Sequence, residues 1–346
     1  MFFQRPEGII RDLTVLDPEY LPESLPFREA HIQEIARTIS FTLSGKISEN
    51  IFIVGPPGVG KTAVVRYVLK QLASYSPQTF QAYINCWVYR TRYAILARFA
   101  SMLGIPIPRR GIALDEVLDR IFERLERHRG AVIVLDEVDR LAISDAEVLY
   151  EFSRLRDFVD VPVVLITIAN SESFVYTLDP RVYSTLFQKK LVFSPYTVPQ
   201  LKKILAERAA LAFFPDTYDE DVLGICAAVG WKRGGDARAA IACLLEAAKL
   251  AEAEGAERIT VEHARRAIQG VDVLRRDVDP KYRPIVEILS EKGAMRVRDL
   301  YAEYIKRAAK VTPRTFRNYL SELERLGIIE IRRLNERGYV REVRLR

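Results

Sequence analysis

The sequence is poor in cysteine, and this scarcity bears on where the protein works. Its three cysteines, Cys86, Cys226 and Cys243, lie far apart and form no C-x-x-C pair. Three thiols are too few to stabilise a chain of 346 residues through disulfide bonds. We therefore expect reduced cysteines in the core of an intracellular protein.

Long apolar runs are also missing. The residues that follow Met1, FFQRP, do not form the apolar segment of a signal peptide. The longest apolar stretch, residues 161–169, is about half as long as a membrane-spanning helix. We expect neither export nor membrane insertion, and the sequence contains no internal repeat or low-complexity segment.

The excess of positive charge is small, +6 overall, but it is unevenly distributed. Residues 281–346 contain 17 basic and 9 acidic side chains, a net charge of +8. Residues 1–280 contain 35 basic and 37 acidic side chains, a net charge of −2. A nearly neutral body with one cationic end favours a polyanionic partner that binds chiefly at that end.

The chain is longer than one core usually organises, so we expect two or three domains. Its first part contains short apolar runs rich in valine and isoleucine, separated by helical or loop segments. Buried parallel strands are typically built this way. The pattern predicts an α/β domain over residues 1–195 with a doubly wound parallel sheet, whose strands are 51–54, 82–84, 131–135, 161–169 and 191–193.

The remaining sequence predicts two smaller domains. A helical domain is expected over residues 196–275, with helices at 199–213, 219–229, 237–254 and 260–269. Residues 280–346 show three helical patterns and then two alternating strands around a turn, which is the order of a winged helix. Its expected elements are the helices 283–291, 296–308 and 313–326 and the strands 328–333 and 339–345.

The stretch GPPGVGKT, residues 55–62, matches the phosphate-binding pattern G-x-x-x-x-G-K-[ST] between a strand and a helical run. Its glycines let backbone N–H groups turn toward phosphate, and the helix N-terminus adds a positive dipole. Lys61 is suited to reach the β and γ phosphates, and Thr62 to ligate Mg²⁺. The expected nucleotide-binding residues of the loop are Gly58, Val59, Gly60, Lys61, Thr62 and Ala63.

Polar residues end two of the expected strands. Asp136 and Glu137 follow the strand 131–135, at the edge where ligands of open α/β sheets bind. Asp136 is the second candidate Mg²⁺ ligand, and Glu137 is placed to polarise the water that attacks the γ-phosphate. Asn170 follows the next strand, where it either positions this water or caps the following turn.

Two arginines are further candidates. Arg238 lies at the start of a helix capped by Asp236, where a cation opposes the helix dipole. This placement favours a phosphate across a cleft as its partner, although a surface arginine is the alternative. Arg181 is either an arginine finger that enters a neighbouring subunit's site or an ordinary surface residue.

In combination the motifs resemble those of the AAA+ ATPases. GPPGVGKT, LDEVDRL, ITIAN and GDAR correspond to the Walker A, Walker B, sensor 1 and sensor 2 motifs. Other stretches narrow the resemblance to archaeal initiators of the origin recognition complex and cell division control protein 6 type. These stretches are residues 16–32, 83–86, 105–121, 193–209 and 312–330, so the resemblance covers nearly the whole chain.

The resemblance implies an AAA+ parallel-sheet ATPase domain with a helical lid, followed by a winged-helix domain. It implies ATP or ADP with Mg²⁺, and slow hydrolysis that switches the protein's state. In such initiators the residues that match Tyr196 and Arg208 help to hold the nucleotide at the hinge between the domains. The implied partners are double-stranded origin DNA, the minichromosome maintenance helicase and other initiator paralogues, in the cytoplasm on the nucleoid.

The expected helix 313–326 has the two faces of a DNA recognition helix, with an apolar face and a polar one. Its candidate DNA contacts are Arg314, Arg317 and Asn318. The hairpin adds side chains suited to phosphates or a minor groove: Arg332, Arg333, Arg337, Tyr339 and Arg341. Related initiators also touch the duplex with an insertion, here about residues 87–125, and its candidates are Arg109 and Arg110, although an ordinary loop explains the stretch almost as well.

Two other functions fit part of the pattern. An AAA+ branch-migration motor also ends in a winged helix, and it would hydrolyse ATP rapidly in the presence of DNA. A nucleotide-gated transcription regulator would bind promoters and leave helicase loading unchanged. The initiator stretches favour the replication initiator over both.

Overall fold

The computed structural model describes residues 8–46, 49–106, 114–141, 145, 147–178, 180–274, 282–308, 311–325, 329–333 and 341–345. The chain forms two compact units, Met1–Arg265 and Arg266–Arg346. The sequence predicts the end of the helical domain at residue 275, whereas this division falls inside the helix α10 (Val261–Leu274).

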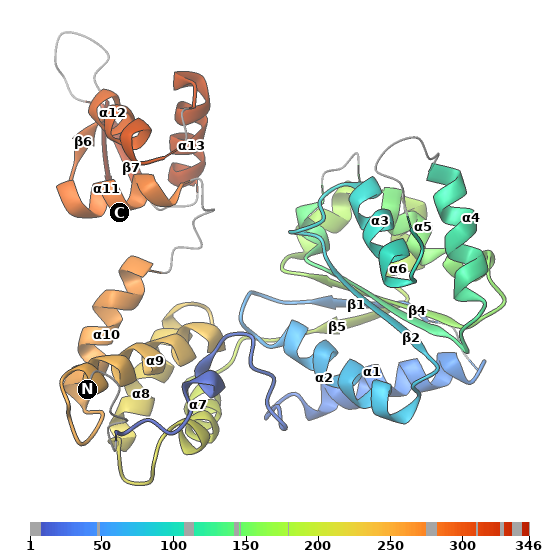
Figure 1. Ribbon diagram of the computed structural model, residues 1–346, viewed down its shortest axis with the longest axis horizontal. Coiled ribbons are helices and arrows are strands. Elements are labelled where there is room, and N and C mark those ends of the chain that lie inside the picture. The colour runs from blue at the N-terminus through green and yellow to red at the C-terminus, as the bar shows by residue number, and fades with distance from the viewer. Residues whose placement is uncertain are drawn as a thin grey trace. The chain divides into compact units, whose positions relative to one another are not determined.

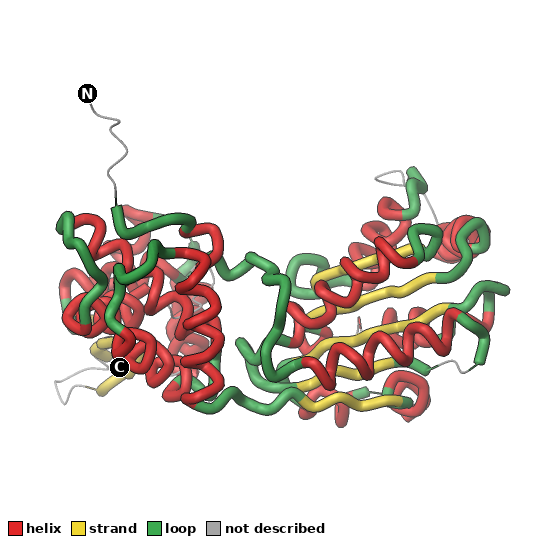
Figure 2. Tube along the Cα trace, turned by 90° about the horizontal axis from the view of Figure 1, so that it is seen from below, coloured by secondary structure: helices red, strands yellow, loops and turns green. Residues whose placement is uncertain are grey.

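A five-stranded parallel sheet, in the order β2-β3-β4-β1-β5, forms the centre of the first unit. The yellow strands run side by side in Figure 2. Each predicted apolar run forms one strand, and β4 begins only after Pro162, which has no N–H to donate to a ladder. The strands are β1 (Ile51–Val54), β2 (Phe80–Asn85), β3 (Ala131–Asp136), β4 (Val163–Ala169) and β5 (Lys189–Val192).

Helices cover both faces of this sheet, because successive strand residues point to opposite sides (Figure 1). Phe52 and Ile133 pack into one core with α3 to α6, and Ile53 and Val132 pack into the other with α1 and α2. The doubly wound α/β fold is thereby confirmed. The helices are α1 (Glu29–Leu43), α2 (Lys61–Tyr75), α3 (Arg92–Met102), α4 (Leu114–Leu125), α5 (Glu147–Ser153) and α6 (Pro180–Leu186).

The helical lid follows the sheet. Its helix α9 is rich in alanine, which lets α7 and α8 pack closely against it. None of the helices that the structure describes is long and apolar enough to cross a membrane. The lid contains α7 (Val198–Ala212), α8 (Glu220–Lys232), α9 (Ala237–Ala253) and α10.

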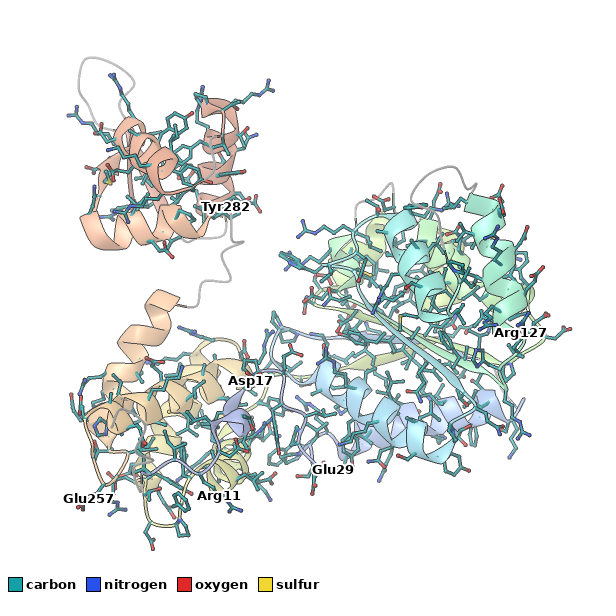
Figure 3. All side chains as sticks on the ribbon, viewed as in Figure 1. Arg11, Asp17, Glu29, Arg127, Glu257 and Tyr282 are labelled. Carbon is teal, nitrogen blue, oxygen red and sulfur yellow. The ribbon has the colours of Figure 1, made fainter. Side chains whose placement is uncertain are left out.

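Part of the N-terminal segment packs on the lid. The backbone N–H groups of Arg11 and Asp12 donate to the Ala212 carbonyl oxygen, at 2.8 and 3.0 Å. The short 3-10 helix η1 (Leu13–Leu16) ends in two buried residues and contacts α7 and α9. Figure 3 labels Arg11 on this segment. The sequence assigns residues 1–195 to the sheet domain, but these contacts join the segment to the lid.

In the part of the second unit that follows α10, the described residues form the helices α11, α12 and α13 and an antiparallel sheet in the order β6-β8-β7. One apolar core joins its elements, with Phe316 and Leu320 of α13 packed among residues from the other two helices and the strands. The strand β6 has only two residues, too few to leave a pattern in the sequence. The elements are α11 (Arg283–Lys292), β6 (Met295–Arg296), α12 (Val297–Arg307), α13 (Pro313–Arg325), β7 (Ile329–Arg333) and β8 (Arg341–Leu345).

Candidate nucleotide-binding site and nucleic-acid interface

The glycine-rich loop joins the buried strand β1 to the helix α2. Gly58 and Gly60 have φ angles of +76° and +88°, in the left-handed region that glycine adopts without strain. A Cβ on Gly58 would collide with the Asp236 carboxylate, and one on Gly60 would lie 3.0 Å from the Tyr196 hydroxyl. The loop therefore needs glycine at both positions, for its own path and for its neighbours.

Lys61 begins α2 and is almost fully buried. Its Nζ donates hydrogen bonds to the carbonyl oxygens of Gly55 (2.6 Å) and Pro56 (2.8 Å). A third hydrogen bond, of 3.1 Å, reaches Oδ1 of Asn170. Burial lowers the pKa of Lys61 to about 8, and the Asp136 carboxylate opposes this shift. The amine thus lies where the loop meets the ends of β3 and β4.

We expect nucleotide binding to take up a proton through Lys61. A phosphate beside this amine raises its pKa from about 8 because the anion stabilises the charged form. Binding at pH 8 should then take up roughly half a proton, and this contribution should fade toward pH 6, where the amine is already charged. Calorimetric titrations in buffers of different ionisation enthalpy measure the number of protons taken up on binding. In Lys61→Arg the guanidinium is always charged, so equal uptake by that variant would contradict the assignment.

Asp136, the last residue of β3, is held at both carboxylate oxygens. Oδ2 accepts from the Thr62 hydroxyl at 2.7 Å and from the Tyr83 hydroxyl at 2.5 Å. Oδ1 accepts from the backbone N–H of Glu137 at 2.8 Å. Burial and the Asp136 charge raise the pKa of Tyr83, so its hydroxyl remains a donor. The two predicted Mg²⁺ ligands thus lie together, and Tyr83 joins them although it was not predicted as a site residue.

Glu137 adopts a left-handed backbone conformation, with φ of +57° and ψ of +41°. This conformation is unfavourable for a residue with a Cβ, and strained residues of this kind cluster at functional sites. Burial and the Asp136 carboxylate raise the pKa of Glu137, whereas Arg140 lowers it. A carboxylate with a raised pKa is suited to accept a proton near neutral pH.

Asn170 directly follows β4 and contacts Lys61 and Asp139. Its side-chain oxygen accepts from Lys61, and its backbone N–H donates to Oδ1 of Asp139 at 3.1 Å. The Asn170 side chain therefore lies in the site, which a role in positioning the attacking water requires. Its action on water stays a prediction.

The lid meets the glycine-rich loop through Asp236 and Ala237, the N-cap and the first residue of α9. The backbone N–H of Ala237 donates to the Gly58 carbonyl oxygen at 3.0 Å. Oδ1 of Asp236 caps α9 by accepting from the Arg238 N–H at 2.8 Å. The half-exposed Arg238 lies close enough for its charge to lower the pKa values of Lys61 and Glu137. The structure thus brings Arg238 to the site, and its contact with phosphate stays a prediction.

Tyr196 is buried beside Gly60 of the glycine-rich loop and against Arg28. Arg28 was not predicted as a site residue. The Arg28 guanidinium lies 4.0 Å from the centre of the Tyr196 ring. It also donates to the carbonyl oxygens of Val59 (3.0 Å) and Ser194 (2.8 Å). Arg28 therefore connects the glycine-rich loop to residues 194–196, at the hinge between the sheet domain and the lid. A single arginine between a proline-rich stretch and a helical pattern was the available signal.

Arg208 is buried on α7 and binds the N-terminal segment. It donates to the carbonyl oxygens of Val15 (2.5 Å) and Tyr20 (3.2 Å), and its guanidinium covers the Tyr20 ring at 4.6 Å. Tyr196 thus lies beside the phosphate loop, whereas the contacts of Arg208 join the lid to residues 15–20. Nucleotide binding by these two residues stays a prediction.

The helix α13 has the two faces that the sequence predicts. Its residues Phe316, Leu320 and Leu323 are buried in the core of the second unit. The polar residues predicted to read DNA are exposed: Arg314, Arg317 and Asn318. The helix therefore presents two cations and an amide to solvent, which are the groups that reach base edges in a major groove.

Several predicted contacts lie outside the described residues: Arg109, Arg110, Arg337 and Tyr339. The backbone places Arg332 and Arg333 in β7 and Arg341 at the start of β8. It places Arg181 in α6. The roles of all these residues stay predictions.

Two protein families match the chain. The family described as "AAA domain" matches residues 48–172, and the family described as "Cdc6 AAA+ ATPase-type lid domain" matches residues 202–269. These matches cover the strands β1 to β4 with the glycine-rich loop, and most of the helical lid that contacts this loop. The fold and the site define an AAA+ ATPase.

Similar proteins narrow this class. The ORC1-type DNA replication protein of Desulfurococcus amylolyticus is 33% identical, over 98% of this chain and 92% of the relative. The structure of the Aeropyrum pernix ORC1 protein in complex with DNA is similar with a TM-score of 0.80 at 34% identity, covering 98% and 94% of the two chains. Cdc6p from Pyrobaculum aerophilum is similar with a TM-score of 0.70 at 26% identity, over 98% and 94%. The chain belongs to the family of ORC1-type DNA replication proteins, which confirms the resemblance to archaeal initiators.

Proposed function

We propose that the protein is an ATP-dependent initiator of DNA replication. It binds double-stranded origin DNA and helps to load the minichromosome maintenance helicase. The observation that carries the switching part of this function is the hydrogen bond from Ala237 of the lid to Gly58 of the phosphate loop, 3.0 Å long. A nucleotide that changes the loop also changes the surface on which the lid packs. ATP binding and slow hydrolysis then bias the position of the lid.

The chemistry of the site follows from its groups. Lys61 and the N-terminus of α2 bind the phosphates. Glu137 accepts a proton from the attacking water, and the Asn170 amide orients this water. The Thr62 hydroxyl and the Asp136 carboxylate, 2.7 Å apart, are oxygen ligands that fit Mg²⁺. A bound Mg²⁺ supplies positive charge to the β and γ phosphates.

Residues around the hinge and in a neighbouring subunit complete the proposal. Arg238 contacts the γ-phosphate from the lid, and Tyr196 and Arg208 hold the nucleotide at the hinge. Arg181 enters the site of an adjacent initiator, so paralogues on neighbouring DNA sites are partners. We assign residues 1–195 to the ATPase domain, 196–275 to the lid and 280–346 to the DNA-binding domain, with the N-terminal contacts of the lid noted above. The protein works in the cytoplasm, on the nucleoid.

DNA binding is carried chiefly by the second unit. The exposed polar face of α13 and the net charge of +8 over residues 281–346 are complementary to a duplex. The relative from Aeropyrum pernix is a protein in complex with DNA, and its fold is shared over nearly the whole chain. The arginines of the hairpin, with Arg109 and Arg110 of the insertion, provide the remaining contacts.

Arg314→Ala is expected to weaken DNA binding for most sequences and to reduce the slope of log affinity against log salt by about one unit, if the side chain meets a phosphate. If it reads a base instead, we expect a loss of about 1–3 kcal/mol confined to the cognate sequence. Fluorescence anisotropy at several salt concentrations measures both. The control is Arg298→Ala, which removes one exposed charge from α12 of the same unit. Equal binding by wild type and Arg314→Ala would remove this residue from the interface.

A footprint on chromosomal DNA, with and without ATP, tests the function as a whole. An initiator protects an origin and changes its protection with ATP. Protection of promoters alone, without an effect on helicase loading, would establish the transcription regulator instead. Rapid ATP turnover stimulated by DNA would establish the motor. The family assignment favours the initiator among these three.

A further inference from the structure

Tyr83 lies on β2, the edge strand of the sheet next to β3. The strands pair in parallel, with Tyr83 opposite Val134 and Asn85 opposite Asp136. Alternate residues of a strand lie on the same face of the sheet, and so do residues that pair between parallel strands. Tyr83 and Asp136 therefore share a face, with Asp136 two residues beyond Val134, the partner of Tyr83. This is the face that α2 covers, since Tyr83 and Val134 belong to the same core as Val64 and Val65. The register thus places the phenol below the start of α2.

The Tyr83 hydroxyl donates to the same Asp136 oxygen that accepts from Thr62. The two hydrogen bonds are 2.5 and 2.7 Å long, and the other oxygen of Asp136 accepts from the Glu137 backbone. A carboxylate that is hydrogen-bonded at both oxygens cannot rotate freely about its Cβ–Cγ bond. Without the Tyr83 hydroxyl, Oδ2 of Asp136 would retain the hydrogen bond from Thr62 and lose the other.

The Tyr83 ring is itself held in place. The Arg66 guanidinium, one helical turn after Thr62, lies 5.1 Å from the centre of the ring. Arg66 in turn forms an ion pair with Glu19 of the N-terminal segment, at 2.6 Å. The ion pair is exposed and adds little energy. The aromatic ring is therefore covered on one side, and its hydroxyl points to Asp136.

We propose that Tyr83 is a positioning residue for the Mg²⁺ site, which orients the Asp136 carboxylate toward Thr62 and so sets the affinity for Mg²⁺ in the nucleotide complex. This inference rests on the proposed binding of Mg²⁺ and nucleotide at this site. Groups that hydrogen-bond to metal ligands commonly contribute 10- to 100-fold to metal affinity or activity. A tyrosine that served only the packing of an edge strand would leave this affinity unchanged.

The experiment compares wild type with Tyr83→Phe, which keeps the ring and loses only the hydroxyl. Binding of a fluorescent ADP analogue is titrated with Mg²⁺, and it is measured separately in excess EDTA. We expect the Mg²⁺ concentration at half-saturation to rise by at least about 10-fold, with affinity in EDTA unchanged. An unchanged Mg²⁺ midpoint overturns the inference, and so does an equal loss of affinity with and without Mg²⁺, which would indicate a role in the fold of the loop.

Tyr150→Phe is the matched control. Its hydroxyl accepts a 2.6 Å hydrogen bond from Arg154, and its ring packs against the core on the other face of the sheet. This variant should reproduce the Mg²⁺ midpoint of wild type. If nucleotide binding by wild type itself does not depend on Mg²⁺, the proposed metal site fails. If wild type depends on Mg²⁺ and Tyr83→Phe depends on it equally, only the role of Tyr83 fails.

Discussion

Lys61→Ala is expected to reduce ATP affinity by at least about 100-fold, which is about 3 kcal/mol. The amine lies at the start of α2, and among the described lysines only Lys61 is buried. In the proposed complex its donors turn from the carbonyl oxygens of Gly55 and Pro56 to phosphate oxygens. Hydrogen bonds between charged groups in a buried site are about twice as strong as neutral ones. Equilibrium binding of a fluorescent ATP analogue measures the loss.

Lys70→Ala provides the control for this variant. Lys70 lies on the same helix, but it is exposed. The substitution therefore removes one positive charge and leaves the site intact, and we expect ATP affinity within about 2-fold of wild type. If Lys61→Ala retained the affinity of this control, the assignment of the phosphate loop would be wrong.

Glu137→Gln should retain ATP binding and lose hydrolysis. Glutamine has nearly the same shape but cannot accept the proton of the attacking water. General base catalysis contributes about 10²–10⁴-fold, so single-turnover hydrolysis should slow by at least about 100-fold while affinity changes by less than about 3-fold. Because the pKa of Glu137 is raised, the wild-type rate should fall on acidification at a higher pH than an ordinary glutamate would give. This pH dependence should be absent from the residual activity of the variant.

The control for Glu137→Gln is Glu126→Gln, an exposed glutamate just after α4. It undergoes the same change of charge outside the site and should leave turnover unchanged. Normal hydrolysis by Glu137→Gln would exclude this residue as the base. A parallel loss of ATP binding would instead assign Glu137 to the fold of the site.

Much of the sheet and the site could be predicted from local patterns. Each short apolar run formed a parallel strand, since a strand buried on both faces leaves a continuous signal. Parallel strands carry the residues at their carboxyl ends to one edge, so Asp136 and Asn170 were expected near Lys61, and the structure brings them there. The two faces of α13 followed equally from its helical period.

Other site residues depend on contacts between distant parts of the chain. Tyr83 reads as one more apolar residue of a strand, and only the register of β2 on β3 brings it to Asp136. Arg28 precedes a helix, and only the packed unit brings it to Val59 and Ser194. The segment around η1 was expected with the sheet, yet it bonds to the end of α7. No local pattern encodes such pairs.

By itself the sequence determined the chemistry available to this protein. The glycine-rich loop with its lysine, the acidic end of β3 and the charge of residues 281–346 are local in the chain, and their properties follow from residue type and spacing. The tertiary structure decided how these groups are held. It placed the lid's Ala237 on Gly58, Arg28 against Tyr196, and Tyr83 and Thr62 on one oxygen of Asp136. The physical reason is that orientation and pKa depend on burial and on neighbours from other elements, which only the packed chain brings together.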